Sequence, residues 1–200
     1  MRIDIKNKEQ EFYATIYDVD IKNISESDFS KIHNTLEIYG VVVLKDQYIN
    51  DNDQIEFSKK FGQLEKALEH DRLKGIREEI TRISNVDENN DILPLSSEKV
   101  IYDRGNRTWH TDSSYKSIPS KFSILSAREI PNKGGGTEYI DARHALEKWD
   151  DKDRKYNLKN LKEEICEHSI VYSRMVNTGD IFDCYNAMEA IAFLNKNTVD

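Results

Sequence analysis

The stretch from Trp109 to Asp141, WHTDSSYKSIPSKFSILSAREIPNKGGGTEYID, carries the most information in this 200-residue chain. It opens on a His-x-Asp pair, His110 and Asp112. The run at 122–127 is typical of a strand, and a glycine-rich loop signal precedes a second strand-like run at 137–140. Because residues two apart on a strand point to the same side, an imidazole and a carboxylate at this spacing can converge on one ion. The stretch predicts a β-rich region that presents a candidate metal site.

The chain before this stretch alternates helix and strand signals. A helix is predicted between Ser25, an N-cap residue, and Gly40, a typical stop, with apolar residues at helical spacing in between. The apolar run at 41–44 lacks alternation and predicts a strand buried on both faces. A second helix is predicted at 51–61, and the alternation at 81–86 predicts another strand.

The chain after this stretch changes character. Residues 142–149 and 153–165 are rich in Lys, Glu and Leu and predict helices with an exposed face, whereas 172–200 is weakly patterned. No segment repeats or has the low complexity of a linker, so residues 1–200 are expected to form a single domain. Its expected class is mostly β with flanking helices.

The composition excludes several classes of protein. The formal net charge is −8, from 37 acidic and 29 basic side chains. Proteins that bind nucleic acids or anionic membranes usually carry an excess of basic side chains, because these partners are negatively charged. The first ten residues lack an apolar signal region, and no stretch approaches ~18 consecutive apolar residues. A cytoplasmic protein without nucleic-acid or membrane partners is therefore expected.

The His-x-Asp pair alone is a weak motif, because such a pair is more often a hydrogen-bonded surface pair than a metal site. Iron(II) oxygenases of the facial-triad class use two His and one carboxylate, which leaves open positions on the metal. The whole stretch from Trp109 to Asp141 is more specific, and it resembles the TauD/TfdA family of taurine and 2,4-dichlorophenoxyacetate dioxygenases, closer to the dichlorophenoxyacetate branch. The resemblance extends to 42–44, Phe61–Glu65, Ile83–Val86, 167–169 and 173–174.

This resemblance implies a double-stranded β-helix, a jelly roll with flanking helices. It also implies an iron(II)- and 2-oxoglutarate-dependent dioxygenase that uses O₂ to hydroxylate a small, anionic organic molecule. His110 and Asp112 would be iron ligands, Thr137 would help to hold the carboxylate of 2-oxoglutarate, and Asn106 would contact the substrate.

The chain departs from the family pattern beyond the motif. In the family, the second iron His and the Arg that pairs with 2-oxoglutarate lie near the C-terminus, far from the His-x-Asp motif. Here 88 residues follow Asp112, and the sequence has no His after His168 and no Arg after Arg174. The expectation is therefore a domain truncated at its C-terminus, without the final barrel strands, the distal His and the distal Arg.

Three alternatives follow from this departure. The chain is a fragment of an oxygenase, or His168 or His144 supplies the third ligand of an unusual but complete site. The third alternative belongs to another class of function, a catalytically inactive remnant that acts as a binding or self-associating module. Unpaired strand edges invite association, so this alternative predicts a homo-oligomer.

Overall fold

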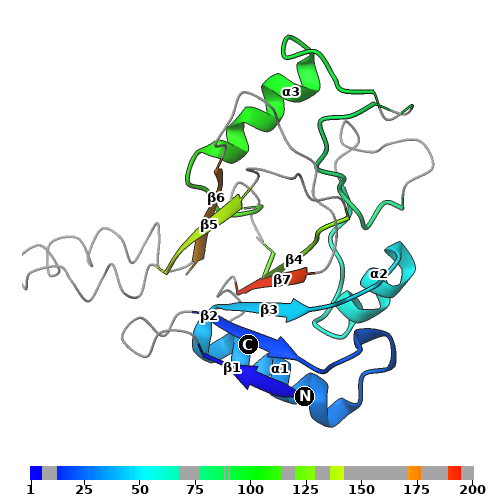
Figure 1. Ribbon diagram of the computed structural model, residues 1–200, viewed down its shortest axis with the longest axis vertical. Coiled ribbons are helices and arrows are strands. Elements are labelled where there is room, and N and C mark those ends of the chain that lie inside the picture. The colour runs from blue at the N-terminus through cyan, green and yellow to red at the C-terminus, as the bar shows by residue number, and fades with distance from the viewer. Residues whose placement is uncertain are drawn as a thin grey trace, which may run out of the picture.

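Figure 1 shows the computed structural model of the chain. It describes residues 1–5, 13–67, 77–87, 89, 91–113, 120–128, 136–141, 171–176 and 189–194. The elements, in chain order, are β1 (Arg2–Asp4), β2 (Tyr13–Tyr17), the 3-10 helix η1 (Ile21–Asn23), α1 (Glu26–Tyr39), β3 (Val41–Lys45), α2 (Asp51–Lys59), α3 (Glu98–Asp103), the 3-10 helix η3 (Arg104–Arg107), β4 (Phe122–Ser126), β5 (Gly136–Asp141), β6 (Val171–Val176) and β7 (Glu189–Leu194). Among the residues that the structure describes, strands outnumber helices, as the sequence predicted.

The described strands form two sheets. The larger has five strands in the order β1-β2-β3-β7-β4, and the smaller is the β5–β6 ribbon. Only β2 and β3 pair in parallel within the larger sheet, while β1 with β2, β3 with β7 and β7 with β4 are antiparallel. Parallel neighbours need a crossover, which α1 supplies between β2 and β3.

Helix α1 begins and ends through local interactions. The Ser25 hydroxyl accepts a hydrogen bond from the Asp28 amide at 3.1 Å, which caps the first turn. Gly40 adopts φ 73° and donates its amide to the Leu36 carbonyl at 2.8 Å. A side chain is strained at that backbone conformation, so glycine lets strand β3 start at the very next residue.

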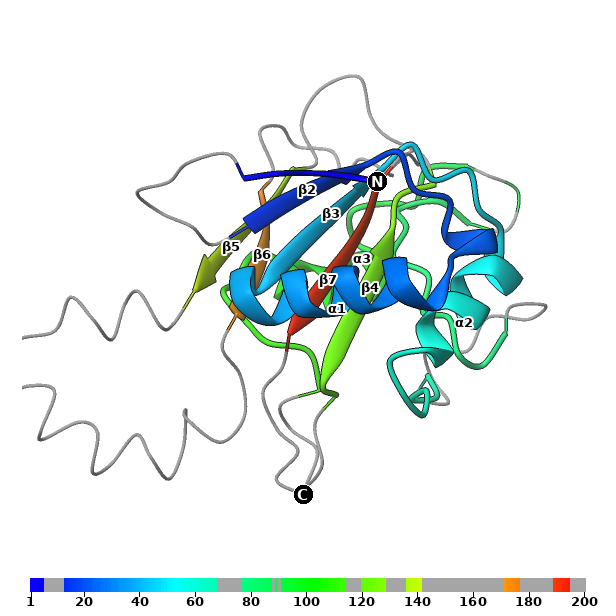
Figure 2. The ribbon, with the colours of Figure 1, turned by 90° about the horizontal axis from the view of Figure 1, so that it is seen from below.

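Helix α1 lies across one face of the five-stranded sheet (Figure 2). Ile32 and Leu36 on this helix are fully buried against Ile16 of β2 and against Val42 and Leu44 of β3. Burying such side chains contributes roughly 1.5–3 kcal/mol each. This core therefore holds the β2-α1-β3 unit together.

An aromatic cluster joins both helices to β4. Phe29 of α1 packs edge-on against Phe57 of α2 and against Phe61, with ring centroids 6.3 and 4.9 Å apart. The Phe61 ring lies 5.2 Å from that of Phe122, the first residue of β4. His33 of α1 stacks on Phe61 at 6.0 Å, so this histidine serves packing.

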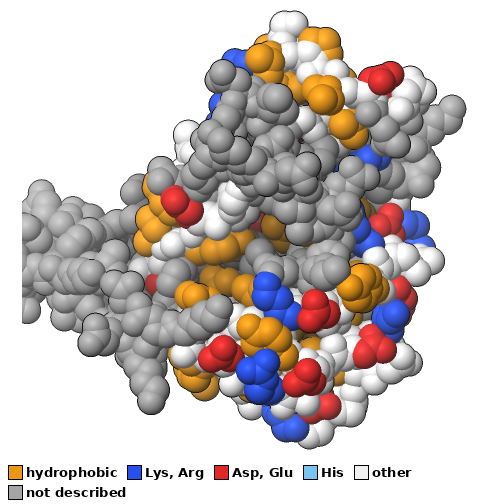
Figure 3. Space-filling model, in the orientation of Figure 1, with side chains coloured by type: hydrophobic (Ala, Val, Ile, Leu, Met, Phe, Trp, Pro, Cys, Tyr) orange, Lys and Arg blue, Asp and Glu red, His pale blue; other side chains and the backbone are white. Residues whose placement is uncertain are grey.

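The β5–β6 ribbon and α3 lie on the side of the sheet opposite α1 (Figure 1). The 3-10 helix η3 continues α3 and contacts β6. Apolar side chains are exposed over α3 at the top of Figure 3, including Ile92, Leu95, Ile101 and Tyr102. Among the described residues, none of the helices has the length and apolarity that a membrane span requires.

Most elements predicted from local signals are confirmed. The helix between Ser25 and Gly40 is α1, and the buried run at 41–44 lies within β3. The predicted helix at 51–61 ends earlier, at Lys59, and the runs at 122–127 and 137–140 correspond to β4 and β5.

The strand predicted at 81–86 is wrong. In this region the structure shows one isolated bridge, between Val86 and Ile92, and irregular backbone. An alternating pattern makes a strand only where a partner strand supplies a continuous ladder. The helices predicted at 142–149 and 153–165 lie outside the described residues.

A buried glutamine ties together the ends of the two parallel strands. Gln47 is 4% exposed; its side-chain oxygen accepts from the Ile21 amide at 3.2 Å. Its side-chain nitrogen donates to the carbonyls of Val19 at 2.8 Å and Lys45 at 2.6 Å. One amide group therefore satisfies three backbone groups where the chain leaves β2 and β3.

Replacing Gln47 by Leu is expected to destabilise the protein by about 2–3 kcal/mol, because it leaves the Ile21 amide and the Val19 carbonyl without their hydrogen-bond partner. Urea denaturation followed by circular dichroism measures the change. The same substitution at the exposed Gln63 is the control and should leave stability nearly unchanged. Equal midpoints for the Gln47 variant and the wild type would contradict this role.

Candidate metal centre

The segment that carries the His-x-Asp pair follows directly from α3 and η3. Ser97 caps α3 by accepting the Val100 amide at 3.3 Å, and Val100 is buried at 2% exposure. At the end of η3, Thr108 donates both its amide, at 3.0 Å, and its hydroxyl, at 2.7 Å, to the Gly105 carbonyl. The double contact ends the helix and directs the chain toward His110.

The imidazole of His110 is oriented by the backbone. Its Nδ1 lies 2.8 Å from the Thr108 carbonyl oxygen. Because a carbonyl only accepts, Nδ1 must carry the proton, which leaves the lone pair of the neutral ring on Nε2. Nε2 lies 3.6 Å from Oδ1 of Asp112, so the nitrogen that is left to bind a metal faces a carboxylate oxygen. A ring nitrogen fixed by a backbone carbonyl is the usual arrangement of a metal-binding histidine.

The pair converges through a turn rather than through a strand. Asp112 and Ser113 form a turn, and Ser113 has a positive φ of 55°. The strand predicted for this motif is therefore wrong, although the predicted convergence of the two side chains is found. Both side chains remain accessible, with 30% of His110 and 49% of Asp112 exposed.

The other predicted site residues lie on neighbouring elements. Asn106 is half-buried on η3, four residues before His110. Thr137 is half-buried on β5, where it shares a face with Tyr139 and with Asp141, which is 3% exposed. Since β6 pairs with β5 and contacts η3, the ribbon that carries Thr137 lies beside the segment that carries Asn106.

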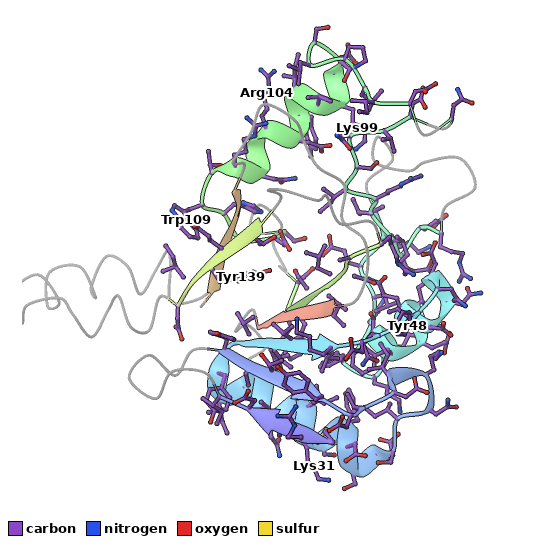
Figure 4. All side chains as sticks on the ribbon, in the orientation of Figure 1. Lys31, Tyr48, Lys99, Arg104, Trp109 and Tyr139 are labelled. Atoms are coloured by element: carbon purple, nitrogen blue, oxygen red, sulfur yellow. The ribbon has the colours of Figure 1, made fainter. Side chains whose placement is uncertain are left out.

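Figure 4 shows two aromatic residues of this region. Trp109 lies beside β5 and is 38% exposed. Tyr139 extends from β5 toward the side of β4 and β7. Its half-buried position agrees with the inward face that it shares with Thr137.

The described residues hold two candidate ligands and no third. Within the described part of the chain, no group of three or more His, Cys, Asp or Glu side chains could hold a metal ion. His144 and His168, the alternative third ligands, lie outside the described residues. The proposal of a third ligand from either residue stays a prediction.

The donor set nevertheless fits an iron(II) ion. Imidazole nitrogen and carboxylate oxygen are two of the three ligands of the facial triad. Adjacent ligands of an octahedral ion with bonds of about 2.1 Å lie about 3 Å apart. The observed 3.6 Å between Nε2 and Oδ1 is close to that separation, so the spacing of the two donor atoms suits one ion.

Sequence reasoning missed one residue beside the pair. Glu65, in the segment after α2, accepts a hydrogen bond from the Ser113 hydroxyl at 2.9 Å and another from the Ser120 hydroxyl. Glu65 belongs to one of the segments that carry the family resemblance, but nothing in its local sequence points to a partner 48 residues away.

Comparisons with known proteins test the family resemblance. The family model described as "Taurine catabolism dioxygenase TauD, TfdA family" matches residues 4–183. The chain belongs to this family. The match includes every candidate site residue, and the family predicted from the sequence is thereby confirmed.

Named relatives come from the branch that the sequence indicated. The alpha-ketoglutarate-dependent 2,4-dichlorophenoxyacetate dioxygenase of Burkholderia sp. (strain RASC) is 30% identical over 158 residues, which are 76% of this chain and 51% of that protein. The (S)-phenoxypropionate/alpha-ketoglutarate-dioxygenase of Delftia acidovorans is 28% identical over 80% of this chain and 52% of its own length. The chain thus spans about half the length of the curated relatives it matches.

Solved structures share the fold of this TauD/TfdA family chain. The crystal structure of AAD-2 in complex with Mn(II) and N-oxalylglycine has a TM-score of 0.75 at 18% identity and covers 99% of this chain and 98% of that chain. A taurine dioxygenase from Burkholderia xenovorans has a TM-score of 0.67 at 17% identity and covers 98% of this chain and 90% of that chain. At these identities the likeness shows the fold.

Replacing His110 or Asp112 by Ala is expected to abolish metal binding, because each change removes one of the two donors that face each other. Titration with Mn(II), read from the electron paramagnetic resonance signal of the free ion, measures the loss. His168→Ala and the exposed Asp91→Ala are the controls and should bind as the wild type does. Loss of binding in His168→Ala would show that the third ligand is His168.

Proposed function

We propose that this protein is an iron(II)- and 2-oxoglutarate-dependent dioxygenase that hydroxylates a small, anionic organic molecule. The observation that carries the proposal is the pair His110 and Asp112, whose Nε2 and Oδ1 face each other at 3.6 Å in a chain of the TauD/TfdA family. We also propose that the five-stranded sheet and the β5–β6 ribbon are parts of one double-stranded β-helix.

When bound, iron(II) would activate O₂, which is the oxidant, while 2-oxoglutarate would supply two of the electrons that O₂ takes up; the protein supplies position and surroundings. Two relatives whose names include alpha-ketoglutarate, and a neighbour whose description includes Mn(II) and N-oxalylglycine, support a metal and 2-oxoglutarate as cofactors. His110 offers Nε2 to the metal because its Nδ1 proton is held by the Thr108 carbonyl. Asp112 offers a carboxylate oxygen, which suits a divalent ion.

Thr137 is proposed to hold the far carboxylate of 2-oxoglutarate. Its hydroxyl can donate a hydrogen bond to a carboxylate, and its place on the half-buried face of β5 keeps this donor partly away from water. Asn106, on η3 beside the pair, is proposed to contact the substrate through its side-chain amide.

The proposed substrate class is a small organic anion. The relatives' names contain dichlorophenoxyacetate and phenoxypropionate, which are both carboxylates. Basic residues near the pair, Arg104, Arg107 and Lys121, could receive such a charge. Arg104 donates to the Leu95 carbonyl at 3.1 Å, and the Lys121 ammonium lies 5.4 Å from the centre of the Phe122 ring.

The family match favours this dioxygenase over the alternative of a catalytically inactive binding or self-associating module. Small-molecule partners with O₂ are proposed on the same basis. Cytoplasmic location, the absence of nucleic-acid and membrane partners, and homo-oligomerisation stay predictions of the sequence, as does the single domain of residues 1–200.

The test of this function is an anaerobic titration of the full chain with iron(II) and 2-oxoglutarate. Where a third ligand completes the site, we expect a weak visible charge-transfer band with about one iron per chain, because bidentate chelation of the metal by 2-oxoglutarate produces such a band. His110→Ala should lack the band. Tight iron binding without a band on adding 2-oxoglutarate would contradict the proposed co-substrate, and no iron binding would contradict the metal centre.

Thr137→Val should weaken 2-oxoglutarate binding about tenfold or more, because a hydrogen bond to a charged group contributes about 1.5–3 kcal/mol. Thr137→Ser keeps the hydroxyl and is the matched control, so its affinity should stay close to that of the wild type. Both affinities come from the same charge-transfer titration at saturating iron(II). Equal weakening in both variants would assign the effect to packing on β5 instead of hydrogen bonding.

A further inference from the structure

The carboxylate of Glu65 joins two points of the chain that flank the residues after the His-x-Asp pair. Its Oε1 accepts from the Ser113 hydroxyl at 2.9 Å, and its Oε2 accepts from the Ser120 hydroxyl. Ser113 directly follows Asp112, and Ser120 lies two residues before β4. One side chain therefore connects the candidate metal ligand's turn to the start of a sheet strand.

The Ser120 end of this connection is firmly placed. Phe61, four residues before Glu65, packs against Phe122, two residues after Ser120, with ring centroids 5.2 Å apart. Two hydrogen-bonding contacts hold the chain just after Glu65, since the Ala67 amide donates to the Glu78 carbonyl at 2.7 Å and the Lys66 ammonium pairs with the Glu78 carboxylate at 2.8 Å. Glu65 is thus presented from a fixed segment.

The backbone at the Ser113 end of this connection is strained and has to be held by a contact. Ser113 has a φ of 55°, a left-handed conformation that is strained for a residue with a side chain. A conformation of this kind persists only where surrounding contacts hold it. The hydrogen bond from the Ser113 hydroxyl to Glu65 is such a contact, and it acts on the residue next to Asp112.

We infer that Glu65 is a positioning residue of the metal centre, which holds the Asp112–Ser113 turn so that the Asp112 carboxylate faces Nε2 of His110. The inference rests on the proposed metal centre. Glu65 acts through Ser113 and through the geometry of two hydrogen bonds, and it does not bind the metal itself. Groups that hydrogen-bond directly to a metal ligand typically change metal affinity about 10–100-fold. Because Glu65 acts through the residue next to Asp112, the lower end of that range, about tenfold weaker binding, is expected without Glu65.

The experiment measures Mn(II) affinity of the full chain by electron paramagnetic resonance, with circular dichroism to confirm that each variant is folded. Glu65→Ala removes both hydrogen bonds, whereas Glu65→Gln keeps a side chain that can accept from one hydroxyl and donate to the other. Ser113→Ala removes the other partner of the bond. Glu56→Ala, an exposed glutamate on α2 that pairs with Lys59, is the matched control.

The inference expects Glu65→Ala to bind Mn(II) about tenfold more weakly, with Glu65→Gln and Glu56→Ala close to the wild type. Ser113→Ala should also bind more weakly, and adding Glu65→Ala to it should cause little further loss, because both changes break the same bond. A melting temperature alone would not show this coupling, since a purely structural contact would lower it too.

Two results would overturn the inference while leaving the metal centre intact. The first is wild-type Mn(II) affinity in a folded Glu65→Ala variant. The second is an equal loss in Glu65→Gln and Glu65→Ala, which would show that the charge of Glu65 matters and its hydrogen bonds do not. If the wild type itself binds no Mn(II), the proposed metal centre is wrong and the role of Glu65 falls with it.

Discussion

The pairing of β7 between β3 and β4 is the constraint on which the sheet depends. Ile191 of β7 is in register with Val43 of β3 on one side and with Leu125 of β4 on the other. Without β7, the β2-α1-β3 unit and β4 would not be neighbours in the sheet, and each would present unpaired backbone groups. This strand therefore fixes where β4 begins, and so where the chain must return after the His-x-Asp pair.

The sequence predicts the elements whose causes are local. Helix α1 could be found because Ser25 and Gly40 mark its ends within the helix's own sequence, and β3 because its residues are apolar without interruption. Strands β6 and β7 could not be found, because their existence depends on partners far away in the chain, such as Val42 for Ala192. The strand wrongly predicted at 81–86 shows the converse, a strand-like pattern without a continuous partner.

The same distinction between local and long-range causes applies to the candidate site. The family resemblance identified His110 and Asp112 from residue types and spacing, and the structure brings their side chains together. How they come together could not be predicted, because it depends on a turn with a left-handed Ser113 and on a ring nitrogen bound to the Thr108 carbonyl. The role of Glu65 could not be predicted, because its hydrogen-bonding partners lie 48 and 55 residues away along the chain.

The junction at Gly40 has a mechanical consequence. A single residue separates the end of α1 from the start of β3, and its amide is bound back to Leu36. So short a joint offers no hinge, and the buried contacts of Ile32 and Leu36 lock the helix onto the strands beneath it. Among the described residues, the sheet and α1 are thus expected to move as one rigid unit, and the β5–β6 ribbon and α3 lie on the face opposite α1.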